Sequence, residues 1–337
     1  MNILDIKAIN TVETRIKPEI KLKTRYLILF GAGILLFWFL YDAVKVRQSA
    51  SDALRLCAAS VIPSLFPFLI VSGLLASADC GKIFAPMLSG IMALYRLPGQ
   101  AGSALALGVL GGYPVGARTT AELYKNGDLT RDEAERLLGF CNNANPAFLW
   151  NILGIGVFGD MRIGIWLLLI HISAAILTGL FFFRGKYNQN HKKSGREIPD
   201  FINFAQNTGD IKNIKNINFF GVLVESVSAA ALTMLKICGF VVFFYILASP
   251  LRNINGITGI ILTGFIDLFS VTPMFEANAT GFILASALSG WGGCGVLFQT
   301  AAALEGSQLS IKNYIFGKIA QGILSGLLAF ILSKYLF

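Results

Sequence analysis

The residues best placed to do chemistry lie at positions 111–118, where Gly-Gly-Tyr-Pro-Val-Gly-Ala-Arg interrupts a long apolar stretch. Glycines, a proline and a cation are poorly suited to the middle of a membrane-spanning helix. Backbone can be irregular at membrane depth only where protein or a water-filled cavity satisfies its freed N–H and C=O groups. A second glycine-rich interruption lies at positions 292–295. Interrupted helices build the substrate sites of many transporters, so this pair of interruptions predicts a transporter.

Arg118 directly follows the first interruption. An arginine at membrane depth needs an anion, a cavity or the membrane interface. One hypothesis is that Arg118 holds an acidic substrate together with Tyr113 and the N–H groups freed near Gly111 and Gly112. The alternative is that Arg118 reaches the headgroups or pairs locally with Glu122, four residues further on.

An asparagine-rich motif, Asn-Asn-Ala-Asn-Pro, occupies positions 142–146 within apolar sequence. Unpaired buried amides cost about 1–3 kcal/mol, so these side chains must find partners. Asn142 and Asn145 are therefore candidates for binding a substrate in a cavity. The alternative is a turn followed by a helix, with Asn145 as the helix cap.

The second half of the chain contains further candidates. Gly292 and Gly293 form the second interruption, and Gln299 occupies the position equivalent to Arg118 when the two interruptions are aligned. Lys236 lies within an apolar segment and is a substrate-binding candidate; the alternative is that it pairs with Asp267. Asp267 and Glu276 are candidates for coupling transport to an ion.

Composition identifies the broad class of protein. The chain has 337 residues, of which 55% are hydrophobic and 14% are charged. Soluble domains contain roughly 25% charged residues, so this composition predicts a polytopic membrane protein. The net charge of +9 is carried by tails and loops beside apolar segments. That distribution indicates cytoplasmic loops and a cytoplasmic N-terminus, and it argues against a nucleic-acid partner.

Enzymatic and metal chemistry have little support in the sequence. The five cysteines form no Cys-x-x-Cys pair, and the two histidines, His171 and His191, lie far apart. We expect no metal, no cofactor and no enzyme. His171 lies in an apolar segment, so we interpret it as a packed interior residue; a proton relay is the alternative.

Apolar segments and their spacing predict an all-α polytopic membrane protein with about eight transmembrane spans. The expected order is a cytoplasmic tail (1–25), an N-terminal transmembrane helix (26–48), a first repeat (53–184), a cytoplasmic linker (185–218) and a second repeat (219–337). Aligning positions 111–123 with 292–304 matches Gly, Gly, Val, Thr, Ala and Leu. This match indicates two related, inverted repeats with broken or re-entrant helices. Thr130 and Glu133 predict a capping box at a helix start.

Four motifs resemble a known family, the YlbJ family of sporulation integral membrane proteins. They are Pro-Ser-Leu-Phe-Pro-Phe at 63–68, Gly-Tyr-Pro-Val-Gly-Ala at 112–117, Glu-Ala-Glu-Arg-Leu at 133–137, and the asparagine motif at 142–146. The resemblance covers roughly residues 50–335. It departs at Ala144, where the family pattern has serine, and around Asp267. The family carries the nucleoside-recognition gate domain that concentrative nucleoside transporters share.

The resemblance implies a role in endospore formation, in the cell membrane or the mother-cell-derived outer forespore membrane. It also implies movement of dipicolinate, a small pyridine dicarboxylate. We therefore expect a transporter of a small organic anion, most of all dipicolinate, whose partners are the anion and the lipid bilayer. The alternatives are a scaffold that recruits sporulation membrane proteins without transport, and a nucleoside-type carrier. A second copy of the chain is a further candidate partner.

Overall fold

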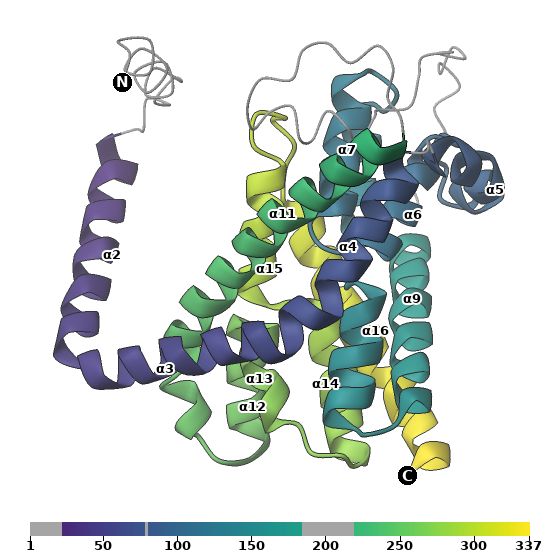
Figure 1. Cartoon of the computed structure of the whole chain (residues 1–337). Coiled ribbons are helices and arrows are strands. Elements are labelled where there is room, and N and C mark those ends of the chain that lie inside the picture. Colours follow the sequence, from purple (N-terminus) through teal and green to yellow (C-terminus); the bar gives the residue numbers. More distant parts are fainter. Residues whose placement is uncertain (1–21, 78–79, 184–218) are drawn as a thin grey trace. The chain divides into compact units, whose positions relative to one another are not determined.

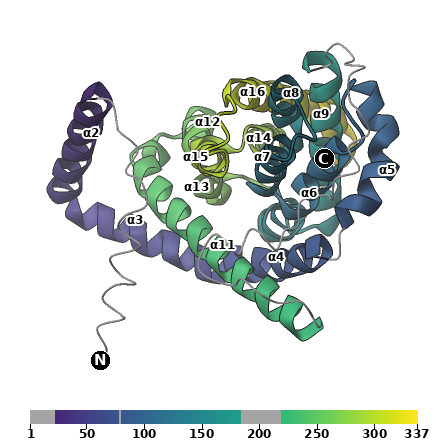
Figure 2. The same ribbon diagram turned by 90° about the horizontal axis from the view of Figure 1, so that it is seen from above.

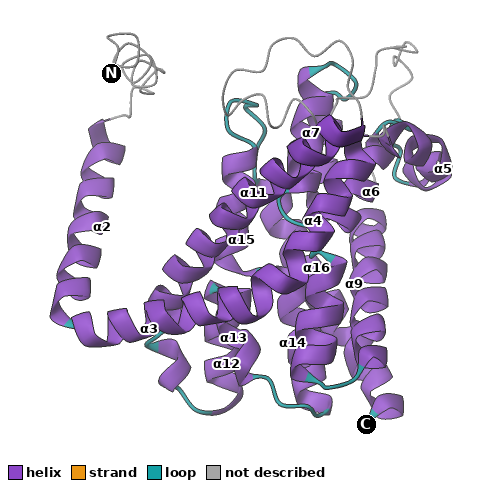
Figure 3. Cartoon of the chain, in the orientation of Figure 1, coloured by secondary structure: helices purple, strands orange, loops and turns teal. Residues whose placement is uncertain are grey.

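The computed structural model describes residues 22–77, 80–183 and 219–337 (Figure 1), and these residues are helical with no β-strand (Figure 3). The expected linker (185–218) and most of the expected tail (1–25) lie outside the described residues. The chain divides into two units, residues 1–48 and 49–337. The first unit contains α2 (Leu22–Tyr41) and the start of α3 (Ala43–Leu56). The helix expected over 26–48 thus ends at Tyr41, because the sequence turns from apolar to charged there.

Among the described residues, five helical segments are long and apolar enough to cross a membrane: Ala43–Leu74, Met161–Phe181, Phe220–Ala248, Ala279–Ala303 and Lys312–Leu336. Other apolar helices, including Ala101–Gly111, Phe148–Val157 and Gly256–Ile266, are shorter. The expected number of spans was about eight, counted from apolar stretches. Several of those stretches are interrupted, and their pieces are too short to span a bilayer of about 30 Å. The described residues therefore form a polytopic helical membrane protein.

The centre of the second unit is formed by α9 (Met161–Phe182), α14 (Ala279–Trp291) and α16 (Lys312–Leu336), which pack side by side (Figures 1 and 2). Helix α11 (Phe219–Ala248) crosses α4 (Ile62–Ser77), which continues from η1 (Cys57–Val61). Helix α5 (Cys80–Leu94) packs against α6. These helices bury one face against the centre and expose large apolar side chains on the other, as expected for a surface in contact with lipid.

The first glycine interruption forms the tip of a helical hairpin. Helices α6 (Ala101–Gly111) and α7 (Val115–Lys125) pack against each other, so the chain reverses at residues 112–114. Helix α8 (Arg131–Cys141) follows and contacts both arms of the hairpin. It begins at Thr130 with the predicted capping box, which is confirmed.

The asparagine motif interrupts the apolar stretch 140–158, as the alternative of a turn followed by a helix predicted. Helix α8 ends at Cys141, and helical structure resumes in η2 (Phe148–Val157), which has π-helical hydrogen bonding. Pro146 explains the interruption, because proline lacks an N–H donor and disfavours helical geometry in the residue before it. The result is a third place where backbone groups need partners from elsewhere in the fold.

The second half contains two further interruptions. Helix α12 (Gly256–Ile266) ends at Asp267, which begins the short helix α13 (Leu268–Val271), followed by η4 (Thr272–Met274). Helix α14 and α15 (Gly293–Ala303) form one apolar segment interrupted at Gly292. The second glycine interruption therefore lies within a segment, whereas the first reverses the chain.

Candidate functional site

A cavity of about 40 Å³ lies where the interruptions meet. Every interrupted segment contributes to its wall, together with α4 and α11. The lining residues are Leu65, Leu69, Gly111, Tyr113, Ala144, Asn145, Phe148, Ile237, Leu268, Phe269, Val296 and Gln299. The wall is mostly apolar with a few polar groups, which is the usual composition of a small-molecule site.

Tyr113 brings the two glycine interruptions together. Its hydroxyl donates to the carbonyl of Ser289 at 3.4 Å, one turn before Gly292. A Cβ atom built on Gly292 would lie 3.2 Å from the Tyr113 hydroxyl oxygen. The absence of a side chain at Gly292 therefore leaves space for Tyr113. Gly292 also has a φ of 87°, which favours glycine. The proximity of the two interruptions, on which the transporter interpretation depends, is therefore present in the fold.

Gly112 allows the hairpin tip to approach the asparagine motif. Its φ is 74° and its ψ is −165°, a combination that is essentially restricted to glycine. A Cβ atom at this position would lie 2.7 Å from the Cβ of Asn145. The amide nitrogen of Asn145 donates to the carbonyls of Leu110 and Gly111 at 3.2 and 3.3 Å. Asn145 thus satisfies carbonyl groups that the end of α6 leaves open.

The two predicted asparagines largely support the interrupted backbone. The Asn145 side-chain oxygen accepts from the N–H of Ala147 at 2.7 Å, as the helix-cap alternative predicted. Asn142 accepts from the N–H of Ala117 at 3.3 Å and donates to the Thr300 hydroxyl at 2.9 Å. Asn142 is buried and does not line the cavity, whereas Asn145 does.

Gln299 is the polar cavity residue that remains available. It projects from α15 into the cavity wall, and its side-chain amide makes no hydrogen bond within the described parts of the chain. A carboxamide can donate and accept, so it suits an oxygen-rich ligand.

The charged candidates lie elsewhere. Arg118 donates to Glu122 at 3.1 Å, which matches the local-pair alternative, and it does not line the cavity. Burial raises the pKa of the Glu122 carboxyl, and the hydrogen bond from Arg118 opposes that shift. Lys236 is exposed on α11, and Glu276 is exposed and accepts from Asn278 at 2.7 Å.

Asp267 is buried at the start of α13 and near the second interruption. Its carboxylate accepts from the N–H and the hydroxyl of Ser270 at 2.7 and 2.6 Å. The proposed pair with Lys236 is absent from the described residues, so that alternative was wrong. A Cβ atom on Gly293 would lie 3.2 Å from the Asp267 Cα, so Gly293 lets α15 approach this helix start.

A buried polar cluster on α16 was missed by the sequence reasoning. Lys318 and Gln321 are 1% and 0% exposed, and the Lys318 ammonium donates to the Gln321 side-chain oxygen at 2.7 Å and the Asn142 carbonyl at 3.4 Å. Gln321 donates to Asn143 at 2.9 Å. A lysine within an apolar segment was the criterion that selected Lys236, and the same criterion applied to α16 selects Lys318.

His171 completes this cluster from α9. It is 1% exposed, and its Nε2 accepts from the N–H of Ala144 at 3.1 Å and lies 3.3 Å from the Gln321 amide nitrogen. The prediction of a packed interior histidine is confirmed. Within the described residues there is no group of three or more His, Cys, Asp or Glu side chains that could hold a metal ion.

Comparisons with known proteins give one informative match. No family model and no solved structure matches the chain. The chain is 26% identical over 308 residues to the sporulation integral membrane protein YlbJ of Bacillus subtilis (strain 168), covering 82% of this chain and 75% of YlbJ. The chain is therefore similar to a sporulation integral membrane protein over most of its length. The resemblance drawn from the four motifs is thus confirmed, and the match to YlbJ extends over most of both chains.

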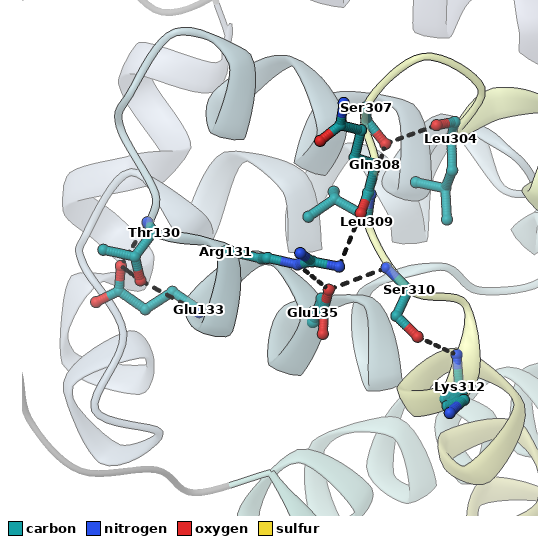
Figure 4. Close-up of polar contacts among 10 residues, drawn as sticks. All are labelled: Thr130, Arg131, Glu133, Glu135, Leu304, Ser307, Gln308, Leu309, Ser310 and Lys312. Carbon is teal, nitrogen blue, oxygen red and sulfur yellow. Dashed lines mark hydrogen bonds and ion pairs between the residues drawn. The ribbon is translucent and has the colours of Figure 1, made fainter.

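A second polar site lies away from the cavity, between α8 and the turn before α16 (Figure 4). The Glu135 carboxylate accepts from Arg131 at 2.8 Å and from the N–H of Ser310 at 3.0 Å. Arg131 also donates to the Gln308 carbonyl at 3.0 Å. The Glu135 carboxylate raises the pKa of Arg131. These contacts join the first half of the chain to the second.

Proposed function

We propose that this chain transports a small organic anion across a membrane during endospore formation. One observation carries the proposal: a mostly apolar cavity lies where the interrupted segments meet, next to a buried lysine whose partners in the described residues are neutral. A purely structural helical bundle has no need for helices that are interrupted in its interior and whose backbone groups require partners from other segments. The sporulation context rests on the similarity to YlbJ.

Dipicolinate is the anion that we propose as cargo. It is a planar aromatic dianion, so it requires both apolar walls and hydrogen-bond donors. Phe148 and Phe269 stack edge to face at 5.2 Å between ring centroids in the cavity wall and offer a surface for an aromatic ring. Tyr113 and Gln299 offer donors to carboxylate oxygens.

The cavity is too small to hold such a cargo as it stands. About 40 Å³ leaves room for a few water molecules at most. We therefore interpret this state as a closed one, and cargo enters when the lining side chains or the hairpin tip move. Opening alternately to the two sides of the membrane is the usual transport cycle for such folds.

The order of elements supports two related halves. Hairpin α6–α7, the interrupted segment α8–η2 and the long helix α9 are followed later by α12–α13, α14–α15 and α16 in the same order. This arrangement favours the inverted repeat with the asparagine motif and Gly292 as equivalent interruptions. Residues from all four interrupted elements line the cavity.

Transport is tested with purified protein in liposomes by measuring uptake of labelled dipicolinate. Ala144→Phe places a large side chain in the cavity, whereas Ala301→Phe makes the same change at an exposed position of α15. We expect Ala144→Phe to abolish uptake and Ala301→Phe to retain it. Absence of dipicolinate uptake by the unchanged protein, or equal uptake by Ala144→Phe, contradicts the proposal.

The scaffold and nucleoside alternatives need separate experiments. Replacing residues 186–216 with a Gly/Ser segment of equal length removes a docking sequence without shortening the chain. A transporter keeps its flux after this replacement, whereas a scaffold loses its function in spore formation. Competition between unlabelled nucleosides and labelled dipicolinate distinguishes a nucleoside carrier, because only that carrier prefers the nucleoside.

A further inference from the structure

The charge of Lys318 has no opposite charge beside it. Its ammonium donates to a carbonyl oxygen and to a carboxamide oxygen, and it faces the Tyr113 ring at 5.0 Å from the ring centroid. None of the partners that it has in the described residues is a carboxylate. Buried charges are normally paired, because removing an ion from water is costly. An uncompensated ammonium within a membrane protein is therefore a candidate for binding an anion.

Tyr113 connects this ammonium to the cavity. Tyr113 lines the cavity, whereas Lys318 does not. The tyrosine hydroxyl is held by one long hydrogen bond of 3.4 Å to the Ser289 carbonyl, beyond the usual 2.5–3.0 Å for such bonds. The Ser289 hydroxyl itself is buried without a partner among the described residues. The weakly held Tyr113 ring thus covers the Lys318 ammonium. The Ser289 hydroxyl is a further donor, on the residue whose carbonyl the Tyr113 hydroxyl contacts.

We propose that Lys318 is the residue by which the cavity selects anions, and that a cargo carboxylate pairs with its ammonium when the Tyr113 ring turns aside. This inference rests on the proposed function and assigns its charge recognition to α16. Arg118, on the hairpin arm α7, already pairs with Glu122. Lys236 is exposed on α11 and cannot face the cavity in this state.

A purely structural role for Lys318 makes a different prediction. In that case the lysine only donates hydrogen bonds to Asn142 and Gln321, and its loss disturbs the packing of α16 for every cargo alike. A role in selecting anions instead changes the ratio of affinities for charged and neutral ligands. The experiment must therefore compare two ligands of the same shape.

The test measures binding of dipicolinate and of its neutral analogue pyridine-2,6-dicarboxamide to the purified full-length protein. The variants are Lys318→Met, Lys318→Arg and the control Lys312→Met, which removes an exposed cation from the same helix. We expect Lys318→Met to weaken dipicolinate binding at least about 10-fold, because the dianion loses a hydrogen bond to a charged group. Binding of the dicarboxamide should change little. Lys318→Arg retains preference for the dianion, and Lys312→Met matches the unchanged protein.

The results that overturn the inference are distinct from those that overturn the proposed function. Unchanged dipicolinate binding by Lys318→Met, or an equal loss for both ligands, overturns the role of Lys318 while transport stands. Lys318→Arg keeps the positive charge, so it keeps the inference testable if Lys318→Met misfolds. Loss of the preference for the dianion in a well-folded Lys318→Arg variant also contradicts the inference. Failure of the unchanged protein to bind or transport dipicolinate overturns both.

Discussion

Single residues decide whether the hairpin tip can reach the asparagine motif. Gly112 has backbone angles that other residues rarely adopt, and its Cα lies against Asn145. We predict that Gly112→Ala lowers stability by about 1–3 kcal/mol, the cost of forcing a side chain into such a conformation. Thermal unfolding in detergent measures this. Gly90→Ala on α5 is the control, because nothing lies near a Cβ there and alanine favours helix. Equal melting temperatures for both variants contradict the prediction.

Gln299 allows a second prediction for a single side chain. Its amide lines the cavity without a hydrogen-bond partner in the described parts of the chain, so its removal leaves no protein group unsatisfied. We predict that Gln299→Leu leaves the melting temperature unchanged and weakens dipicolinate binding about 10-fold, the worth of one hydrogen bond to a charged group. Equilibrium binding checks this. A fall in melting temperature with unchanged affinity shows instead that Gln299 is structural.

At the scale of elements, the contacts of α8 hold the two halves together on one side of the molecule. Glu135 accepts both from Arg131 and from the backbone of Ser310. We predict that Glu135→Leu lowers stability by about 1–2 kcal/mol, because the Ser310 N–H loses its partner. Thr130→Ala is the comparison: it removes the cap of the same helix at a cost of about 1 kcal/mol without touching the second half. Chemical unfolding followed by tryptophan fluorescence distinguishes the two, since only Glu135→Leu is expected to loosen the turn before α16.

Local signals in the sequence predicted some elements well and others poorly. The capping box at Thr130 and the interruption at Gly112 depend on adjacent residues, so their sequence patterns identified them. The contact between Glu135 and Ser310 joins residues 175 positions apart, and no local pattern indicates it. The interruption after Cys141 was predicted only as an alternative, because apolar residues continue on both sides of the motif.

The distinction between local patterns and contacts of distant residues also applies to the candidate site. Tyr113, Asn145, Gln299 and Gly111 were predicted from their neighbours in sequence and do line the cavity. Arg118 was selected because the sequence places it at membrane depth. That criterion does not say which way the side chain points, and in the structure Arg118 pairs with Glu122. Lys318 meets the sequence criterion that selected Lys236, but only the fold shows that its ammonium faces the Tyr113 ring at the hairpin tip.

At the scale of the whole molecule, the closed cavity predicts that access changes during transport. In a cysteine-free background, Val296→Cys places a thiol in the cavity wall, and Glu305→Cys places one at an exposed position after α15. We predict slow labelling of Val296→Cys by a membrane-impermeant thiol reagent without cargo, and faster labelling while the protein turns over in a dipicolinate gradient. Glu305→Cys labels rapidly under both conditions. Rapid labelling of Val296→Cys at all times contradicts a closed state.

The position of Lys318 on the final helix also bears on how the chain enters the bilayer. A lysine in a single inserting helix costs up to about 2.5–3.5 kcal/mol, the value at the helix centre. The Lys318 ammonium donates hydrogen bonds to two oxygens. The Asn142 carbonyl lies on a segment that is synthesised long before, and the Gln321 side-chain oxygen lies on α16 itself. Because α16 is synthesised after the asparagine motif, this part of its partner surface is already in place, and the ammonium can be solvated by protein as soon as the helix docks.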